Sequence, residues 1–305
     1  IIGCAGIKNN AIHKQLHASN CSLQHSYNYK GNELPSPFHL TKIDTLTKSL
    51  LSENSLNIAH AIAVLPKISE YIRLQKSPAS ERSIEQRLHL LELKQQINDK
   101  ISNASLEISA TTAEMDCEEE RTSQIANYLK SKESELESKL TVAAIVVGAS
   151  GALLTSGIVK NDRASNIVGI GTGIAEATLG LIMLFNNRSV EFYHERNALK
   201  EIWEGKASSN IFPASVWYFL KYKNPNIPDS KSQRTQLLEK WANFEQIKSK
   251  ADKTKYTELY FDKGGRYAAD ELTNRANMYD QLESVISLMK QDLNRLSQEF
   301  ESLGK

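Results

Sequence analysis

The densest group of potential metal ligands lies near the start of the chain. Four residues of the stretch HKQLHASNCSLQH follow one another at steps of four: His13, His17, Cys21 and His25. Imidazole and thiolate groups bind zinc, and residues i and i+4 share one face of a helix. Each step of four turns by about 40°, because four residues exceed one 3.6-residue turn. The whole row cannot hold one ion on a straight helix, so we predict a polar, flexible tether and no metal site.

Other groups that could carry chemistry are dispersed. The remaining histidines lie far apart in the sequence: His39, His60, His89 and His194. No spacing places a nucleophile beside a base. The pair Gly264-Gly265 lacks the strand and the Lys-Ser/Thr pair of a phosphate-binding loop. We therefore predict a non-enzymatic protein without a cofactor.

The cysteines leave a redox question open. Beyond Cys4, the chain contains Cys21 and Cys117. An oxidising compartment would permit a disulfide between these two residues. Cysteines so far apart in a sequence are more often free and buried, so both states stay open, with the free state favoured.

The first four residues, Ile1-Ile2-Gly3-Cys4, resemble the lipobox at the end of a bacterial lipoprotein signal peptide. In that family the cysteine is acylated and the chain is cut just before it. The resemblance implies a lipidated Cys4. Because Ala5 is not the Asp that favours inner-membrane retention, it also implies an outer-membrane anchor with the polar parts in the periplasm. One acyl chain binds a membrane only marginally, so stable anchoring needs more than one.

Two apolar segments interrupt this polar chain. The first, LTVAAIVVGASGALLTSGIV, covers residues 140–159, and the second covers residues 164–185. A helix of about 20 residues rises about 30 Å, which matches the hydrocarbon core of a bilayer. The charged link KNDR at 160–163 is typical of a short helix–helix turn. We predict a hydrophobic helical hairpin over residues 140–187.

Small residues recur at every fourth position in both segments. This spacing makes a flat ribbon along one side of a helix and lets two backbones approach closely. The ribbons consist of Ala144, Gly148, Ala152 and Ser156 in the first segment and Ser165, Gly169, Gly173 and Ala177 in the second. The two segments are therefore expected to pair with each other, antiparallel.

Glu176 lies near the middle of the second segment. A carboxylate at that depth costs roughly 2.5–3.5 kcal/mol on insertion scales. It could be protonated, face a partner hairpin or line a wet pore. Three interpretations of the hairpin therefore stay open: a permanent membrane element, a hairpin hidden in a soluble bundle and released at a membrane, and a core without a membrane role.

The rest of the chain favours helix, and no convincing run of alternating strand residues is visible. Apolar residues recur at steps of three and four from Ile84 to Leu140 and again from Leu272 to Leu303. Two such stripes predict partners in a coiled-coil seam.

Shorter elements follow from local signals. A helix over residues 38–75 is expected to be interrupted at Pro66, and Ser80 is a plausible N-cap for the long helix that follows. The sequence after residue 187 is expected to continue as helix to a stop at Gly205. Residues 26–37 contain Gly31 and two prolines and are predicted to be a linker.

These elements predict an all-α fold, an elongated helical bundle or coiled coil with a projecting Gly/Ala-rich hydrophobic hairpin. The predicted segments are a lipid-attachment site and flexible tether at 1–37, N-terminal helices at 38–139, the hairpin at 140–187, an aromatic-rich helical unit at 188–262 and a C-terminal coiled-coil helix at 263–305. The aromatic residues of the fourth segment could be binding anchors, but such residues more often fill a small core.

Net charge and organisation bound the function. A net charge of +1 provides no long-range field that would attract nucleic acid. In organisation alone, the long helices and the mid-chain hairpin resemble helical pore-forming toxins of bacteria, which implies membrane insertion by oligomers. The first hypothesis is a lipid-tethered envelope scaffold or channel component, with membrane lipid and copies of itself or other envelope proteins as partners. The alternatives are a pore-forming or membrane-perturbing effector, and a soluble binding module with a buried hairpin.

Overall fold

The computed structural model describes residues 19, 21–22, 26–76, 78, 80–157, 189–243 and 253–304, without the side chains of 143–157 and 253–255. The chain forms two compact units: unit 1 comprises Ile1–His17, Arg121–Tyr193 and Gly265–Asn274, and unit 2 comprises Ala18–Glu120, His194–Gly264 and Arg275–Lys305. Several predicted positions fall outside the described residues: Cys4, Ser165, Gly169, Gly173, Glu176 and Ala177. The first ribbon, from Ala144 to Ser156, lies on helical backbone.

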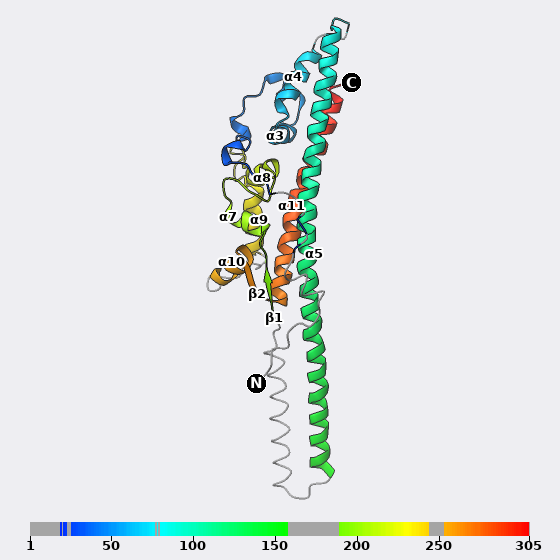
Figure 1. Ribbon diagram of the computed structural model, residues 1–305, viewed down its shortest axis with the longest axis vertical. Coiled ribbons are helices and arrows are strands. Elements are labelled where there is room, and N and C mark those ends of the chain that lie inside the picture. The colour runs from blue at the N-terminus through cyan, green and yellow to red at the C-terminus, as the bar shows by residue number, and fades with distance from the viewer. Residues whose placement is uncertain are drawn as a thin grey trace. The chain divides into compact units, whose positions relative to one another are not determined.

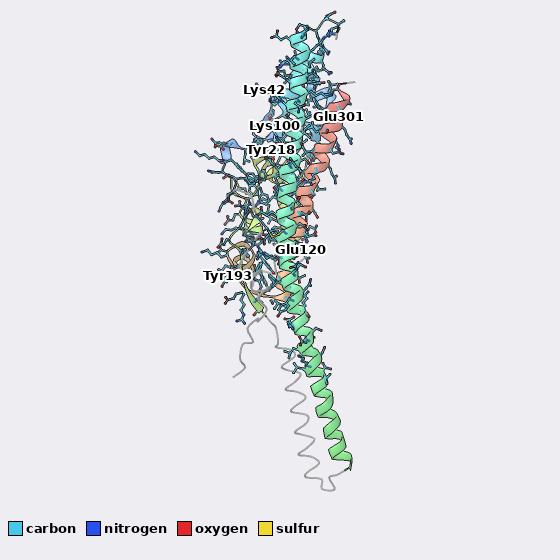
Figure 2. The ribbon with its side chains drawn as sticks, turned by 45° about the vertical axis from the view of Figure 1, so that its right-hand side comes forward. Lys42, Lys100, Glu120, Tyr193, Tyr218 and Glu301 are labelled. Carbon is cyan, nitrogen blue, oxygen red and sulfur yellow. A yellow bond between two sulfur atoms is a disulfide. The ribbon has the colours of Figure 1, made fainter. Side chains whose placement is uncertain are left out.

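The fold is mainly helical, as predicted, but it is not all-α. A strand, β1 (Ser189–Tyr193), pairs with β2 (Gly264–Ala268) in a two-stranded sheet. The prediction of unbroken helix up to Gly205 was wrong at β1. In that strand Val190 and Phe192 are buried while Glu191 and Tyr193 are exposed (Tyr193 is labelled in Figure 2). This period of two is that of a strand with one buried face.

The second strand begins with the glycine pair Gly264-Gly265. Gly264 opens β2 with a φ of 91°, in the region that favours glycine. Within unit 1, the Tyr267 ring meets the Phe192 ring edge-on at 5.7 Å, and the Arg121 guanidinium lies 4.4 Å from the centre of the Phe192 ring. Arg266 Nε also donates to Ser189 Oγ at 2.5 Å. These side-chain contacts stabilise the two-stranded sheet, which would be only weakly stable through its backbone hydrogen bonds alone.

The longest element is α5 (Ile84–Gly157), one helix of 74 residues. Its start lies at Ser83 and not at the predicted cap, Ser80. Ser83 Oγ accepts from the Gln86 backbone N–H, and Gln86 Oε1 accepts from the Ser83 N–H, both at 3.1 Å. This reciprocal pair is a capping box, which satisfies two backbone donors at the helix start.

The last helix, α11 (Ala269–Ser302), carries the second predicted stripe, and that prediction is confirmed. In unit 2, α11 lies alongside α5 in both views (Figures 1 and 2). The α5 side buries Leu90, Leu93, Ile97, Ala104, Ile108 and Met115; the α11 side buries Tyr279, Leu282, Ile286, Met289, Leu293, Leu296 and Phe300. The predicted helical bundle is therefore confirmed.

Three short helices continue this bundle: α2 (Thr45–Leu50), α3 (Glu53–Ala61) and α4 (Leu65–Gln75), preceded by 3-10 turns η1 (Gly31–Glu33) and η2 (Phe38–Leu40). The helix predicted over residues 38–75 is divided more often than expected, into η2 and these three helices. The break nearest Pro66 precedes this proline, which occupies the first turn of α4, where its missing N–H costs nothing. The Tyr71 ring of α4 packs on Phe300 of α11 at 5.0 Å. His89 of α5 contacts Glu70 of α4 at 2.9 Å.

The predicted aromatic-rich region folds as α7 (Ala198–Glu204), α8 (Ala214–Lys221), α9 (Gln233–Asn243) and α10 (Lys253–Phe261). Its large rings are mostly core, as expected: Phe212, Trp217, Trp241 and Tyr260 have no exposed surface. Trp203 stacks on Phe261 with ring centres 4.5 Å apart. The stop at Gly205 is confirmed by its φ of 62°.

Arg234 explains why Gly205 has to be a glycine. The Arg234 guanidinium donates to the carbonyls of Ile202 at 2.6 Å and Trp203 at 2.8 Å, which satisfies the open C-terminus of α7. A Cβ at position 205 would lie 2.4 Å from Arg234 Cζ. The Arg234 guanidinium thus caps the end of α7 in the space that the missing side chain of Gly205 leaves free.

Among the residues that the structure describes, no helix is both long enough and apolar enough to cross a membrane.

Candidate functional site

A disulfide between Cys21 and Cys117 fastens the N-terminal segment to α5. The two Cα atoms are 5.4 Å apart, and the residues are 96 positions apart in the chain. The expectation that free cysteines are favoured was therefore wrong. With its sulfur in this bond, Cys21 cannot serve as the metal ligand considered above, and the described residues contain no cluster of three metal-ligating side chains.

The described residues around Cys21, which we call the strap (residues 19, 21–22 and 26–30), are held by further contacts. Ser19 Oγ donates to Glu118 of α5. The Tyr27 N–H donates to the Asn210 carbonyl at 3.0 Å, and the Tyr29 hydroxyl donates to the Phe212 carbonyl at 3.0 Å. The part predicted as a linker thus begins with residues that pack against the loop between α7 and α8.

An ion pair lies beside the strap. Arg196 Nε donates to Glu114 Oε1 at 2.6 Å, and a second guanidinium nitrogen donates to Oε2 at 3.2 Å. The exposed fractions of the two side chains are 23% and 8%. Arg196 also donates to the Asn210 carbonyl at 3.3 Å. A two-pronged pair of this kind is geometrically specific, and it joins α5 to the loop that holds the strap.

The tyrosines of the strap stay protonated in this setting. Burial raises the pKa of Tyr27, and the carboxylates of Glu107 and Glu114 add to the shift while Arg196 opposes it. Burial raises the pKa of Tyr29 to about 12, although the backbone N–H of Ser209 lowers it in part. Both phenols are therefore neutral hydrogen-bonding groups at physiological pH.

Glu201 of α7 is the least satisfied acid of this region. Burial raises its pKa, and a hydrogen bond from Ser209 and the charge of Lys206 offset part of the shift. Its Oε2 atom is buried and has no hydrogen-bond partner among the described residues. Ser209 Oγ meanwhile accepts from the N–H groups of Ile211 and Phe212. The hydrogen bonds of Ser209 therefore stabilise the loop between α7 and α8.

We call the whole arrangement the clamp: the strap, residues 107–118 of α5 and residues 196–212, which comprise α7 and the loop that follows it. It joins three segments that lie far apart in the chain, by one covalent bond, one ion pair and several backbone hydrogen bonds. These contacts hold the three segments together. Because one of them is a disulfide, a reductant would weaken the clamp.

One sign of the clamp is visible in the sequence itself: Tyr27 and Tyr29 alternate with polar residues. In SYNYK, residues 26–30, the two tyrosines are half-buried while Ser26, Asn28 and Lys30 are exposed. This alternation is that of an extended segment with one face packed. No comparable signal points to Glu114 and Arg196, whose pairing depends on how α5 meets the loop.

Two of the histidines that were considered as catalytic candidates belong to one row of ring contacts. The His60 ring meets the Tyr218 ring edge-on at 6.0 Å, Tyr218 stacks on Tyr222 at 5.3 Å, and His39 stacks with Tyr222. His60 Nε2 is also 2.7 Å from the Ser36 carbonyl. The backbone N–H of His194, in another part of the fold, donates to the Lys263 carbonyl.

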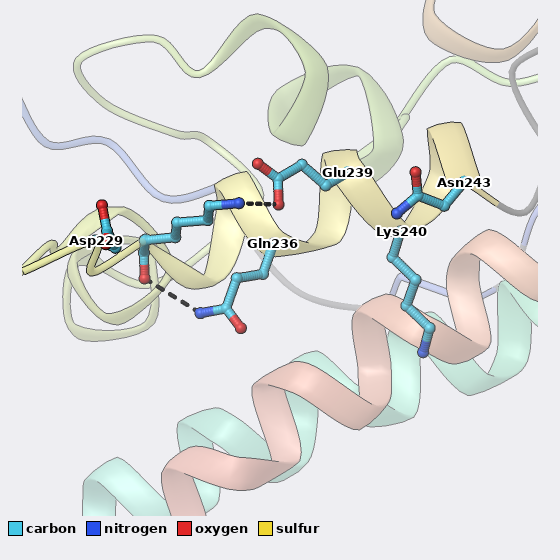
Figure 3. A pocket seen from close by; sticks show the side chains of 6 residues that line it. Asp229, Gln236, Glu239, Lys240 and Asn243 are labelled. Carbon is cyan, nitrogen blue, oxygen red and sulfur yellow. Dashed lines mark hydrogen bonds and ion pairs between the residues drawn. The ribbon is translucent and has the colours of Figure 1, made fainter.

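A shallow polar depression of about 490 Å³ lies on α9 (Figure 3). Lys231 Nζ is 2.7 Å from Glu239, and Gln236 donates to the Lys231 carbonyl at 3.1 Å. Three of the lining residues thus bond to one another, which leaves the depression shallow and without an apolar wall for a ligand.

The comparisons with known proteins give no family for this chain. No protein-family model matches it, and neither the curated proteins nor the solved structures show a similar protein.

Proposed function

We propose that the protein is a non-enzymatic helical scaffold of the bacterial cell envelope that engages a membrane through the hydrophobic hairpin at 140–187. In this proposal the acylated Cys4 is a second attachment to lipid. Copies of the chain or other envelope proteins are the partners.

The observation that carries the proposal is the continuity of α5. The helix that holds Cys117 and Glu114 of the clamp continues without a break through residues 140–157, the first apolar segment. One helix, α5, therefore contains both residues of the clamp and an uncharged apolar stretch.

The disulfide supports a location outside the cytoplasm. Disulfides persist in the periplasm and beyond the cell, and are rare where thioredoxin and glutathione keep thiols reduced. A lipoprotein that follows the lipobox resemblance would reach this same oxidising compartment. The two lines of reasoning are independent, since one rests on Cys4 and the other on Cys21 and Cys117.

The hairpin can be tested by placing a charge on it. In a Cys4→Ser background, which removes the acyl anchor, Leu153→Arg should abolish association with membranes, because Arg costs roughly 3 kcal/mol at mid-bilayer. The matched control is Leu106→Arg: Leu106 lies on the same helix in unit 2 and is 65% exposed. Membrane flotation measures association, and circular dichroism measures helix content.

The outcomes separate the interpretations. If Leu153→Arg keeps its helix content and leaves the membrane fraction while Leu106→Arg stays, the proposal holds. Loss of helix content or aggregation of Leu153→Arg alone would identify the hairpin as a soluble core. A folded Leu153→Arg protein that still floats with membranes would contradict membrane engagement by residues 140–157.

A second candidate, a membrane-perturbing effector, is favoured by one observation. Among residues 130–142 of α5, which lead into the apolar segment, no side chain is buried. A segment in which no side chain is fully buried is compatible with movement on contact with a membrane. Release of a trapped dye from liposomes by the purified protein would support the effector, and intact liposomes with bound protein would support the scaffold.

A further inference from the structure

A cavity of about 770 Å³ opens in unit 2, away from the clamp. Its walls are the segment 38–43, parts of α2 and α3, and the segment that follows α8. Pockets that bind small molecules usually have volumes of about 300–1,000 Å³. The cavity is therefore of the size that holds a small ligand, and neither the hairpin nor the clamp makes use of it.

Apolar side chains form part of the wall. Phe38, Leu51 and Leu56 line the cavity and are 9%, 5% and 2% exposed. The Phe38 N–H donates to the Tyr218 hydroxyl at 3.1 Å, and this hydroxyl donates to Asn57 at 3.0 Å (Tyr218 is labelled in Figure 2). These bonds fix the apolar wall, so the cavity is formed before any ligand arrives.

Two lysines line the same cavity. Lys42, labelled in Figure 2, and Lys48 are exposed, and neither makes an ion pair within the described part of the chain. The carboxylate among the lining residues, Glu53, accepts a hydrogen bond from Asn224 at 2.8 Å. The lysines are therefore the charged groups of this wall that remain available to an anion.

Two hydroxyls lie closed off from solvent in residues that line the cavity. Thr41 Oγ1 and the Tyr222 hydroxyl are both buried, and neither makes a hydrogen bond of normal geometry with the described residues. Burial raises the pKa of Tyr222, although the backbone N–H of His39 offsets part of the shift. Buried polar groups usually have partners, so the Thr41 hydroxyl provides bonding capacity that the described residues leave unused, whereas the Tyr222 hydroxyl faces the His39 N–H.

We propose that this cavity binds a small amphipathic anion. The apolar tail would lie against Phe38, Leu51 and Leu56, and the carboxylate or phosphate would lie between Lys42 and Lys48. Such an anion could be a free single-chain amphiphile or the head group of a membrane lipid. The proposal is independent of the hairpin, because it rests on unit 2 alone.

The probe is decanoate, used below its micelle-forming concentration with the full chain in a calorimetric titration. Decanol and decyltrimethylammonium carry the same tail with no charge and with a positive charge. We expect decanoate to bind at one site, decanol to bind more weakly and the cation not to bind there. The double variant Lys42→Gln, Lys48→Gln should weaken decanoate binding several-fold, since each exposed charge pair contributes roughly 0.2–1 kcal/mol.

Matched variants separate this cavity from other apolar surfaces. Lys223→Gln removes the same charge from an exposed lysine next to Tyr222 that does not line the cavity, and it should leave decanoate affinity unchanged. Ile43→Trp should fill the cavity and abolish binding, with circular dichroism as the check on folding. Binding to the hairpin would be indifferent to all of these changes.

The proposal is overturned if decanoate does not bind, if the double lysine variant binds it as tightly as the native chain, or if the cation binds equally well. Flotation with phosphatidylglycerol vesicles then distinguishes the two sources of the anion, in a Cys4→Ser, Leu153→Arg background that removes the other two proposed attachments to lipid. If this background protein binds decanoate but does not float, the anion is a free amphiphile. If it floats and the double lysine variant does not, the anion is a lipid head group, and both results support the anion site.

Discussion

Two stretches of the same helix, residues 84–120 and 130–142 of α5, are stabilised in different ways. The first buries a side chain at nearly every turn, including Leu93, Ile97 and Ile108, which are at most 3% exposed. It also carries Cys117 and Glu114 of the clamp. In the second stretch no side chain is buried, and Val142 is 61% exposed.

The second stretch depends on local interactions. Glu135 pairs with Lys132 at 2.8 Å and with Lys139 at 2.7 Å, one turn before and one turn after it. Their hydrogen bonds and charges lower the pKa of Glu135 to about 2. Such exposed pairs are screened by water and contribute little to stability. Helix propensity and local pairs therefore maintain 130–142, whereas tertiary packing maintains 84–120.

This difference teaches that one continuous helix can contain regions of unequal stability. Local opening in proteins follows burial and contact, so it varies along an element as well as between elements. We expect the amides of 130–142 to exchange with solvent faster than those of 84–120. Substitutions in α5 and in the clamp test this comparison, and the disulfide variants are expected to lose the most stability.

Breaking the disulfide should have the largest effect. Cys21→Ser or Cys117→Ser should lower the free energy of unfolding by about 4 kcal/mol, because the bond closes a loop across 96 positions. Urea titration measures this loss, and hydrogen exchange should place it in 84–120 and not in 130–142. Native protein in dithiothreitol should behave like the variants; insensitivity to the reductant would refute the role given to this bond.

Core truncation tests the packing directly. Ile108→Ala should cost about 3 kcal/mol, because Ile108 is fully buried and its loss leaves a cavity. Leu136→Ala, the same kind of truncation at a half-buried site of the second stretch, should cost less than about 1 kcal/mol. Equal costs in urea titrations would remove the distinction between the two stretches.

The ion pair of the clamp should show an intermediate effect. Arg196→Met should cost about 2 kcal/mol, because it leaves the mostly buried Glu114 carboxylate without its charge partner. Lys200→Met is the control, since its pair with Asp262 is exposed and should matter little. Adding Glu114→Met to Arg196→Met should recover part of the loss, and no recovery would contradict the pairwise explanation.

The smallest expected effect is a pH dependence at Glu201. Its folded-state pKa is raised above the ordinary value of 4.5, so the folded state favours the protonated acid. The contribution of this group is complete below its unfolded pKa and is lost as the pH rises through the folded pKa. Glu201→Gln should therefore flatten the pH dependence of stability on the alkaline side of 4.5 and be slightly more stable there. Identical pH profiles by thermal unfolding would contradict the assignment.

Several elements could be predicted from the sequence because their causes are local. The stripes of α5 and α11, the proline in the first turn of α4 and the stop at Gly205 all follow from residues within one or two turns. The aromatic core of the α7–α10 region was also expected, since large rings are seldom left in solvent. The N-cap of α5 was predicted at Ser80, whereas it lies at Ser83. Both residues are serines, and what marks Ser83 is Gln86, three residues later, which completes the capping box.

The errors share a different cause. β1 was read as helix because five alternating residues are a weak pattern beside the helix formers around them. Its partner, β2, follows more than seventy residues later. The free state of Cys21 and Cys117 was favoured because sequence separation gives no sign of which helix face carries Cys117. The cavity lined by Thr41 and Tyr222 combines two segments that have no pattern in common.

Most of the helical residues could be recognised from the sequence alone, because a helical hydrogen bond joins a residue to its fourth neighbour. The apolar stripe of a helix likewise repeats every three or four residues, so both signals are local. Only the tertiary structure decided that Cys21 meets Cys117, that Tyr29 meets Phe212 and that Arg196 meets Glu114. Each of these contacts requires the chain to return over many tens of residues. That return depends on the combined packing of all the helices, and no local pattern encodes it.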